Sequence, residues 1–448
     1  MKRLFSLLGG TALAMSLAVA GAQAPQSGGI AVEQNRMVEP IVPAPDERID
    51  DWSERFLQKM GLSEFGEHHG KYFYYAQMPV MLPQTDPQYA NALINAYDKA
   101  MFNIYEQFAM DMYGKVLQEQ TREFFQNSST DADKLEAPTA NVRGMVGKVL
   151  ALMDKSLDVA DKELDKKLAE LGVDPAQYRK LTPRQKKDLF KERFLKKTIK
   201  KASGDISGLF TVQSAVAVDK SGNAVVGVIA VVSPKTRQIA KDIRLQRRSL
   251  IAGKGRDIRS LIPQKPDALF STLGTRLVYD SDGTPAIISY GMHSYMPQKD
   301  HYLNVRLKQN AKDAAVAVAD GQIAMLVNGF LSARFERQRG EEVNRYIERE
   351  LKPDAMSVEK TVRNVIDKTY QRAKASASMR LQGVSTFKTW RYTLPAGQKV
   401  VGAVRVWRYA TLDAVRRFKE GYKPKPKSRP KGKSSFGESE IVNDINDF

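Results

Sequence analysis

Two stretches of this chain resemble each other closely enough to predict that one structural unit occurs twice. Residues 202–236 align with residues 377–411 without a gap at an offset of 175, and 10 of the 35 aligned positions are identical. The identical residues include spaced glycines such as Gly208 and Gly383, whereas chance similarity of two valine-rich hairpins would explain only the shared Val-Val-Gly triplet. A repeat of this kind restricts the fold to architectures built from two copies of one unit.

A second pair of segments lies upstream of the first and extends the similarity. The segments that begin at Lys71 and Ala286 align at an offset of 214, which pairs Met78 with Met292. Each segment has the pattern of a strand, a Pro-Gln-x-Asp breaker and a long helix rich in alanine. The downstream segments each have the pattern of two strands joined by a glycine turn and followed by a basic helix. The difference in offset, 214 − 175 = 39, assigns 39 additional residues to the first unit.

These patterns predict an α+β fold with two tandem duplicated units, each a small, mainly antiparallel sheet covered by long helices. The alternative is an irregular fold that contains two similar hairpins. The expected parts are a signal peptide at 1–20, a flexible leader at 21–50, a first unit at 51–250 with a helical insert at about 120–200, a connector with a hairpin strand at 251–285, a second unit at 286–420 and a disordered tail, basic and then acidic, at 421–448. The Asp-Ser-Asp-Gly sequence at 280–283 predicts the turn of the connector hairpin.

The first residues are typical of a secretory signal peptide. Lys2 and Arg3 form a charged start, and an apolar run of mostly small residues follows as far as Val19. This run is too short to favour a spanning helix. Cleavage after Ala20 satisfies the small-x-small rule, and Ala24 is the alternative. We therefore expect the mature chain in the periplasm, either soluble or bound peripherally to a membrane.

The charge of the chain indicates the kind of partner. The formal net charge is +19, and such an excess implies acidic partners. For an exported chain these are another envelope protein or an anionic envelope polymer or lipid, such as lipopolysaccharide or the cell wall. Nucleic acid is disfavoured, because an exported chain would meet it only outside the cytoplasm. The chain has no cysteine, so it forms neither a disulfide nor a lipid-modified cysteine.

Two basic segments are the candidates for contact with an anionic partner. Residues 184–201 predict an amphipathic helix after a Thr-Pro start, and residues 235–259 contain Arg-Arg and Gly-Lys-Gly-Arg sequences. Each segment carries nine basic and two acidic residues, 9 − 2 = +7. The helix could lie on an anionic membrane, or it could be a surface helix whose apolar side packs on the core. The predicted contact residues are Lys186, Lys187, Lys196, Lys197, Lys200, Lys201, Arg247, Arg248, Lys254 and Arg256.

A further segment is a candidate for self-association. Residues 146–171 place Leu150, Met153 and Leu157 at coiled-coil spacing, and Gly172 supplies a stop. One interpretation is a helix that packs its apolar stripe on its own domain. The other is a protruding helical hairpin that pairs with a second copy of the chain.

The sequence contains no motif that indicates catalysis. A zinc site would have to combine the four histidines, His68, His69, His293 and His301, with carboxylates, and the spacing of a zinc protease is absent. Neither a nucleophile elbow nor a phosphate-binding loop of the required spacing occurs. We therefore predict a non-enzymatic protein without catalytic residues, metal or cofactor, and the alternative is a metalloprotein or hydrolase that uses the histidines.

The strand at 286–296 and the helix that follows it, with alanine every three or four residues through 308–330, resemble a known envelope pattern. The pattern is similar to the N-terminal α+β module of flagellar T-ring assembly proteins and related small outer-membrane lipoproteins, and an uncharacterised periplasmic family would fit equally. The chain departs from the lipoproteins because it lacks the cysteine that anchors them. The resemblance implies a scaffold or accessory factor of a flagellar, pilus or secretion assembly, and it carries over no catalytic residue.

Overall fold

The fold comes from a computed structural model of the whole chain. It describes residues 43–125, 142–157, 161–203, 208–328, 347, 349–376 and 382–420. The predicted signal peptide, most of the predicted leader and the predicted tail lie outside the described residues. Within the described ranges, every helix is too short or too polar to cross a membrane.

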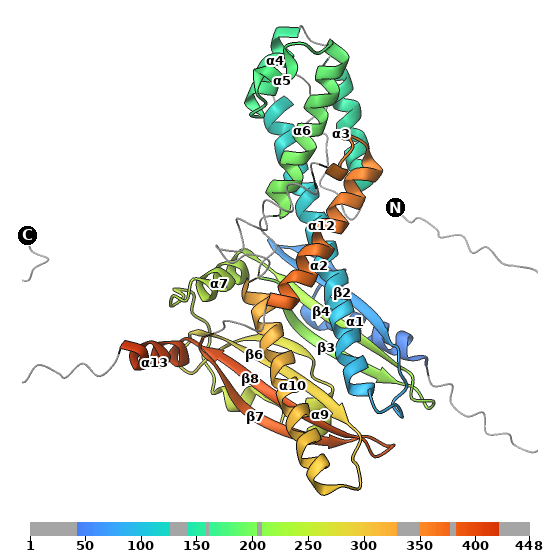
Figure 1. Cartoon of the computed structure of the whole chain (residues 1–448), viewed down its shortest axis with the longest axis vertical. Coiled ribbons are helices and arrows are strands. Elements are labelled where there is room, and N and C mark those ends of the chain that lie inside the picture. The colour runs from blue at the N-terminus through green and yellow to red at the C-terminus, as the bar shows by residue number, and fades with distance from the viewer. Residues whose placement is uncertain are drawn as a thin grey trace, which may run out of the picture. The chain divides into compact units, whose positions relative to one another are not determined.

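The described residues form two four-stranded antiparallel sheets (Figure 1). The first sheet has the strand order β1-β2-β4-β3 and the second has the order β5-β6-β8-β7. The strands of the first sheet are β1 (Gly66–His68), β2 (Lys71–Val80), β3 (Phe210–Val218) and β4 (Ala224–Val232). The strands of the second sheet are β5 (Gly274–Tyr279), β6 (Pro285–Tyr295), β7 (Val384–Thr393) and β8 (Lys399–Arg408). The predicted α+β class, with two small antiparallel sheets, is confirmed.

Helices occur in a similar order around both sheets. The helices of the first half are α1 (Pro45–Met60), α2 (Tyr89–Phe125), α3 (Val142–Ser156), α4 (Asp161–Glu170), α5 (Pro175–Tyr178), α6 (Pro183–Ser203) and α7 (Pro234–Arg244). The helices of the second half are α8 (Ile258–Leu261), α9 (Pro266–Phe270), α10 (His301–Asn328), α12 (Ala355–Ser376) and α13 (Tyr409–Glu420). The long helices α2 and α10 each follow a strand hairpin and pack on the sheet that contains it (Figure 1). The predicted order of strand, long helix, further helix, hairpin and helix is therefore found in both halves.

The two sheets also share an irregularity. The β3–β4 ladder has a register shift between Thr211 and Gln213, and the β7–β8 ladder has one between Thr386 and Lys388. The two residues that flank the shift in β3 correspond to the two that flank it in β7 at the aligned offset, since 211 + 175 = 386 and 213 + 175 = 388. A shift of this kind bends a strand and increases its twist. The two hairpins are therefore bent at the same position.

The recurring glycines at the start of β3 and β7 have a steric cause. Gly208 and Gly383 both have positive φ, +88° and +92°. A Cβ would lie 2.6 Å from the Cα of Arg237 at the first position and 2.9 Å from the Cβ of Leu412 at the second. Arg237 and Leu412 are themselves related by the same offset, 237 + 175 = 412. In each half, the helix after the hairpin approaches the glycine so closely that a side chain would collide with it.

The strand register corrects the alignment of the upstream segments. Tyr72 pairs with Val232, whose equivalent in the second half is Trp407, and Trp407 pairs with Ile287. Tyr72 is therefore equivalent to Ile287, at an offset of 287 − 72 = 215 instead of 214. The predicted offset of 214 aligns the Pro-Gln-x-Asp segments that follow the strands. The strands themselves align at 215, so the spacing between strand and Pro-Gln-x-Asp segment differs by one residue in the two halves. The correction matters because one residue exchanges the two faces of a strand.

The boundary of the predicted leader is also wrong. Helix α1 begins at Pro45, within the stretch that we expected to be flexible up to residue 50. Its first turn carries Asp46 and Glu47, and the Glu47 carboxylate accepts a hydrogen bond of 3.0 Å from the Ala44 N–H. Proline and acidic residues are common in flexible segments, but they are equally favourable in the first turn of a helix.

The predicted connector at 251–285 contains regular structure. It holds α8, α9 and β5, so the second sheet begins before residue 286. The expected turn forms between β5 and β6: the Gly283 N–H donates to the Asp280 carbonyl at 2.7 Å, and the Asp280 N–H donates to the Thr284 carbonyl at 2.9 Å. The two strands on either side of this turn, β5 and β6, pair antiparallel.

Tyr97 of α2 contacts both sheets. Its hydroxyl oxygen lies 2.7 Å from Oγ1 of Thr211 in β3. The same oxygen would lie 1.9 Å from a Cβ at Gly274, the first residue of β5, whose φ is +84°. Nearby, Nη2 of Arg276 donates to the Ser214 hydroxyl at 2.9 Å. The edges of the two sheets therefore meet through side chains at β3 and β5.

We expect Gly274→Ala to lower the free energy of unfolding by about 3 kcal/mol. The added methyl group would displace Tyr97, and the alanine backbone would have to keep the positive φ of Gly274. Gly397→Ala is the matched control, since Gly397 has φ +89° but a Cβ added there would have no neighbour within 4 Å. We expect that control to cost about 1 kcal/mol, the backbone contribution alone. Urea denaturation measures both variants. Equal losses would contradict the contact between Tyr97 and Gly274.

Candidate functional site

Two of the six predicted contact lysines on α6 are buried against acids of the same chain. Lys186 is 4% exposed, and its ammonium nitrogen lies 2.7 Å from Oδ1 of Asp165. Lys196 is 6% exposed, and its ammonium nitrogen lies 2.5 Å from Oε1 of Glu192. These positions correct the prediction for both residues, because a buried ammonium group that already has a carboxylate does not face a partner.

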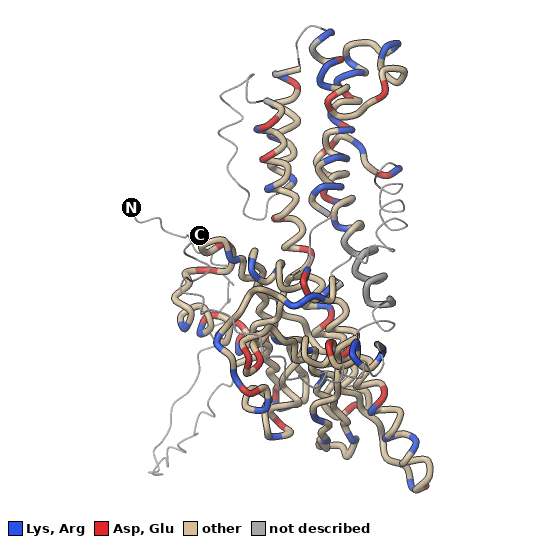
Figure 2. The backbone as a smooth tube through the Cα atoms, turned by 90° about the vertical axis from the view of Figure 1, so that its left-hand side faces the viewer, with Lys and Arg blue, Asp and Glu red and all other residues tan. Residues whose placement is uncertain are grey.

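The other four lysines of α6 stay predicted contacts. Lys197 lies over the ring of Phe124, with its nitrogen 5.4 Å from the ring centroid, and Lys201 lies 3.7 Å from a carboxylate oxygen of Glu119. Lys187 and Lys200 are half-buried. Figure 2 shows acidic positions interspersed with basic ones along the helices of the insert. The excess of lysine in the sequence therefore does not produce a face that is basic throughout.

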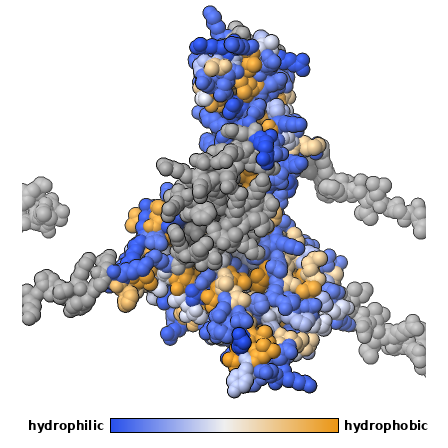
Figure 3. Space-filling view, in the orientation of Figure 1, coloured by the Kyte–Doolittle hydropathy of each residue, from blue (hydrophilic) through white to orange (hydrophobic). Residues whose placement is uncertain are grey.

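The apolar side of α6 packs inside the chain. Its buried residues are Phe190, Phe194, Leu195 and Ile199. Phe124 of α2 meets the two phenylalanine rings edge to face, at centroid distances of 6.0 and 5.5 Å. In the view of Figure 3 the outer surface of the insert is mostly hydrophilic. The helix is therefore a surface helix with a core-facing side, and its apolar side is not presented to a membrane.

The predicted helix at 146–171 is two helices, α3 and α4, and its apolar stripe is buried. Met153, Leu157 and Leu164 are each almost fully buried in the main hydrophobic core. The helical stretch ends at the predicted stop, since Gly172 has φ +76°. Because the stripe packs within the chain, it is not available for pairing with a second copy in this conformation.

The remaining four predicted cations lie on residues 245–257, which we call the basic connector. A buried carboxylate holds the start of this segment. Asp242 accepts hydrogen bonds from Nε of Arg247 at 2.7 Å, from Oγ of Ser249 at 2.8 Å and from Nε2 of Gln238 at 2.7 Å. Burial alone would raise the pKa of Asp242, but these hydrogen bonds and the charge of Arg247 hold the pKa below its ordinary value.

The backbone at Gln246 confirms that the basic connector is held in a particular conformation. Gln246 has φ +53°, in the left-handed region that residues other than glycine seldom adopt. Its carbonyl oxygen accepts a hydrogen bond of 2.5 Å from Nη2 of Arg416 in α13. Because the left-handed conformation is unfavourable by itself, neighbouring contacts such as this one must stabilise it.

The Gly-Lys-Gly-Arg sequence fits the basic connector against the β5–β6 hairpin. A Cβ at Gly253 would lie 2.5 Å from the ring of Tyr279, and a Cβ at Gly255 would lie 2.5 Å from the carbonyl oxygen of Asp280. Two backbone hydrogen bonds of 3.1 Å join the segment to the same hairpin. The glycines therefore allow close packing of two backbones, and they do not form a phosphate-binding loop.

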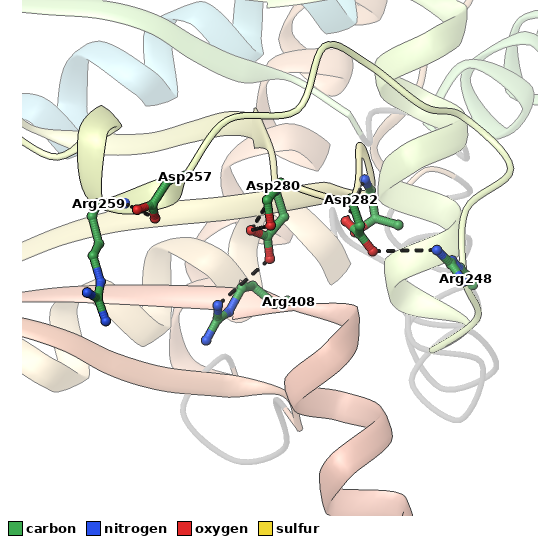
Figure 4. A network of polar contacts seen from close by, with 8 residues as sticks. Arg248, Asp257, Arg259, Asp280, Asp282 and Arg408 are labelled. Atoms are coloured by element: carbon green, nitrogen blue, oxygen red, sulfur yellow. Dashed lines mark hydrogen bonds and ion pairs between the residues drawn. The ribbon is translucent and has the colours of Figure 1, made fainter.

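Figure 4 shows the charged groups around the basic connector and the hairpin turn. Nη2 of Arg248 lies 3.5 Å from Oδ2 of Asp282, and Nη1 of Arg408 lies 3.8 Å from Oδ2 of Asp280. The carboxylate of Asp257 caps the start of α8 by accepting a hydrogen bond of 3.0 Å from the Arg259 N–H. Arg248 is exposed, so its pairing with an exposed carboxylate contributes little to stability and leaves the guanidinium accessible.

The basic connector also carries cations that form no ion pair among the described residues, together with exposed apolar side chains. Lys254 and Arg256 are exposed and form no ion pair with any residue in the described ranges. Leu245 is 51% exposed and Leu250 is 99% exposed. A segment held by Asp242 and the hairpin therefore presents two unpaired cations and two leucines to the solvent.

A cleft of about 590 Å³ lies between β1, β2, α2 and α12, and our reading of the sequence missed it. Four polar residues of α2 line it at intervals of four: Asn103, Gln107, Asp111 and Lys115. This spacing places them on one face of the helix. A polar stripe in an otherwise apolar helix is the signal that indicates such a cleft from sequence alone.

Tyr74 and Asp111 form a hydrogen-bonded pair in the cleft. The Tyr74 hydroxyl donates to Oδ2 of Asp111 at 2.8 Å, and Tyr74 is almost fully buried. Burial raises the pKa of the Tyr74 hydroxyl, so it stays protonated and acts as the donor. Burial also raises the pKa of Asp111, although the hydrogen bond from Tyr74 opposes the rise.

Two ion pairs lie at the same cleft. Glu67 of β1 accepts a hydrogen bond from the Tyr72 hydroxyl and lies 3.3 Å from the ammonium nitrogen of Lys115, which is 4.2 Å from the centroid of the Tyr72 ring. Arg363 of α12 pairs with Glu106 of α2. Since α12 lies in the second half of the chain, the cleft is completed by residues from both halves.

The histidines do not gather in the structure. His68 is in the first sheet, where its Nε2 lies 2.7 Å from the Glu64 carbonyl oxygen, and His69 is in the turn that follows. His293 is in the second sheet, where burial lowers its pKa, and His301 begins α10. No group of three or more histidine, aspartate or glutamate side chains in the described part of the chain could hold a metal ion.

Comparison with known proteins finds one matching protein family and one similar crystal structure. Residues 149–245, from α3 to the end of α7, match a family described as a domain of unknown function (DUF6844). The 2.3 Å crystal structure of hypothetical protein FTT1539c from Francisella tularensis is similar, with a TM-score of 0.52 and 21% sequence identity, over 83% of this chain and 92% of that chain. The curated proteins contain no significant match. The likeness shows the fold alone, and neither comparison names a function.

We expect Asp242→Ala to release the basic connector, because Arg247 and Ser249 lose their buried acceptor. Amide hydrogen exchange at residues 246–251 should become faster, and the free energy of unfolding should fall by about 1 to 3 kcal/mol. The pKa of Asp242 is lowered in the folded chain, so its stabilisation is complete above the ordinary pKa of aspartate. It is lost as the pH falls through the lowered value. Exchange that stays as slow as in the parent chain would contradict this role.

We expect Asp111→Asn to raise the melting temperature at neutral pH. The pKa of Asp111 is raised in the folded chain, so the stability that it contributes is present at low pH and declines as the pH rises through the raised value. Melting curves between about pH 4 and about pH 8 measure this effect, and the advantage of the variant should widen with pH. Asp51→Asn, at an exposed position of α1, is the control. A lower melting temperature at every pH would mean that Asp111 stabilises the fold.

Proposed function

We propose that this chain is an exported, non-enzymatic protein of the bacterial envelope that binds an acidic partner through the basic connector. The observation that carries the proposal is the pair Lys254 and Arg256, which are exposed and form no ion pair with any described residue. Asp242 and the β5–β6 hairpin hold the segment that presents them. A cation that is already held in place loses less conformational freedom on binding.

The favoured partner is an acidic protein of an envelope assembly of the flagellar, pilus or secretion type. For such an assembly this chain would be a scaffold or an accessory factor in the periplasm, as the predicted signal peptide at 1–20 supports. The net charge of +19 favours attraction to an acidic surface before contact. The exposed lysines of α6 extend the contact, and the common topology of the sheets supports descent of the two units from one ancestral copy.

An anionic lipid surface is the second candidate partner, and the exposed leucines favour it. Leu245 and Leu250 flank the cations Arg247 and Arg248 in the sequence. Apolar side chains beside basic ones are the combination with which peripheral proteins contact acidic membranes. An anionic wall or lipopolysaccharide polymer would use the cations but gain little from the leucines.

We expect Lys254→Glu with Arg256→Glu to weaken association with isolated envelope fractions at low salt by about tenfold or more. The matched control is Arg306→Glu with Lys312→Glu, two exposed positions of α10 that produce the same change in net charge. Sedimentation at several salt concentrations measures the bound fraction. Equal weakening by both double variants, or by neither, would contradict binding through the basic connector.

The leucines separate the two candidate partners. We expect Leu245→Ser with Leu250→Ser to leave association with an acidic protein almost unchanged, since the cations are retained. Binding to vesicles that contain anionic phospholipid should fall about tenfold only if lipid is the partner. Flotation of the chain with anionic and with zwitterionic vesicles measures this difference. If the parent chain binds anionic vesicles and the leucine variant does not, the partner is a lipid surface and the proposal of an acidic protein partner is wrong.

A further inference from the structure

The second sheet has an apolar pair at the position of a polar pair in the cleft. In the first sheet Glu67 of β1 lies opposite Tyr72 of β2. Since Tyr72 is equivalent to Ile287 by strand register, the equivalent pair in the second sheet is Leu277 and Ile287. Ile287 is fully buried in a hydrophobic cluster that includes residues of α10, and Leu277 packs against this cluster.

The next residue on the same face of the strand is smaller in the second sheet. Tyr74 is equivalent to Ser289, since 289 − 74 = 215. Ser289 is fully buried, and its hydroxyl donates to the backbone carbonyl of Ala319 at 2.8 Å. The sheet and its long helix are thus in direct contact at this position in the second half. The fold itself therefore does not require a polar cleft between the sheet and the helix.

The ionised carboxylate of Asp111 is unfavourable for folding. Asp111 is a half-buried carboxyl group, and this burial disfavours its ionised form. In the equivalent region of the second half, the carboxylate of Asp320 on α10 pairs with Arg405 of β8, whereas Asp111 receives only the hydroxyl of Tyr74. Groups that cost stability and cluster in a concave site are characteristic of ligand binding.

The charges of the cleft indicate which ligand it suits. Both cations that line it, Lys115 and Arg363, already pair with glutamates. Asp111 accepts one hydrogen bond, from Tyr74, and its Oδ1 has no donor among the described residues. What this carboxylate lacks is therefore a cationic hydrogen-bond donor.

We propose that the cleft binds a small organic cation, a primary amine, with the ammonium group on Asp111. Its volume of about 590 Å³ is that of a site for a small molecule. The side-chain amide of Asn103 lines the same face of α2 and has no hydrogen-bond partner among the described residues. It supplies a second polar contact for a ligand hydroxyl group. This site is separate from the basic connector and does not depend on the partner proposed there.

Isothermal titration of the full mature chain tests the proposal with two amines and their neutral analogues. The amines are glucosamine and 1,5-diaminopentane, and the neutral analogues are glucose and 1,5-pentanediol. We expect at least one amine to bind, and its neutral analogue to bind about tenfold more weakly or not at all, because it lacks the charge that Asp111 attracts. The proposal is overturned if neither amine binds at about 10 mM, or if a neutral analogue binds as well as its amine.

Variants then locate the binding site. Asp111→Asn should weaken amine binding about tenfold or more, whereas Asp51→Asn should leave it unchanged. Circular dichroism shows whether each variant is folded. Asn103→Ala is a second variant, expected to weaken glucosamine, which has hydroxyl groups, more than 1,5-diaminopentane. Amine binding that survives Asp111→Asn would place the site elsewhere and overturn the assignment to this cleft.

Discussion

Helix α2 packs against both sheets, and the positions of the other features follow from this packing. Tyr97, in its first half, touches Thr211 of the first sheet and leaves no room for a side chain at Gly274 of the second. Further along the same helix, Asp111 meets Tyr74 of β2. The helix also carries Glu106, the partner of Arg363. A shift of α2 would therefore change the contact between the sheets and the geometry of the cleft together.

Asp242, which is buried, and Asp111, which is half-buried, show that the same type of side chain can stabilise or destabilise a fold. Asp242 receives three hydrogen bonds, which lower its pKa despite burial, so its ionised form stabilises the folded chain. Asp111 receives one, and burial raises its pKa, so its ionised form opposes folding. The first is explained by the structure that it holds, the basic connector. Asp111 holds no such segment in place, and this contrast supports the ligand that we propose for the cleft.

Local features of the fold could be predicted from the sequence, and contacts between distant segments could not. The hairpins were predictable because Gly208 and Gly383 recur at a constant offset. The pairing of β2 with β4 and the approach of Arg363 to Glu106 depend on topology, which places residues from both halves at one cleft. Charge counting also failed for Lys186, because composition does not reveal that Asp165 lies beside it. Sequence reasoning therefore identified the basic segments but not which of their cations are accessible.

The two halves have the same strand order, but they differ between the sheet and its long helix, where the cleft of the first half lies. Tyr72 and Glu67 occupy the register positions that Ile287 and Leu277 fill in the second sheet, so the architecture tolerates either a polar or an apolar pair there. In the second half the sheet packs on its long helix, and Ile287, Ile323 and Leu326 are buried in one hydrophobic cluster. Because this packing in the second half contributes stability, the first half can contain groups that are unfavourable for folding. Two sheets with the same strand order thus allow one to stabilise the chain while the other carries the proposed site.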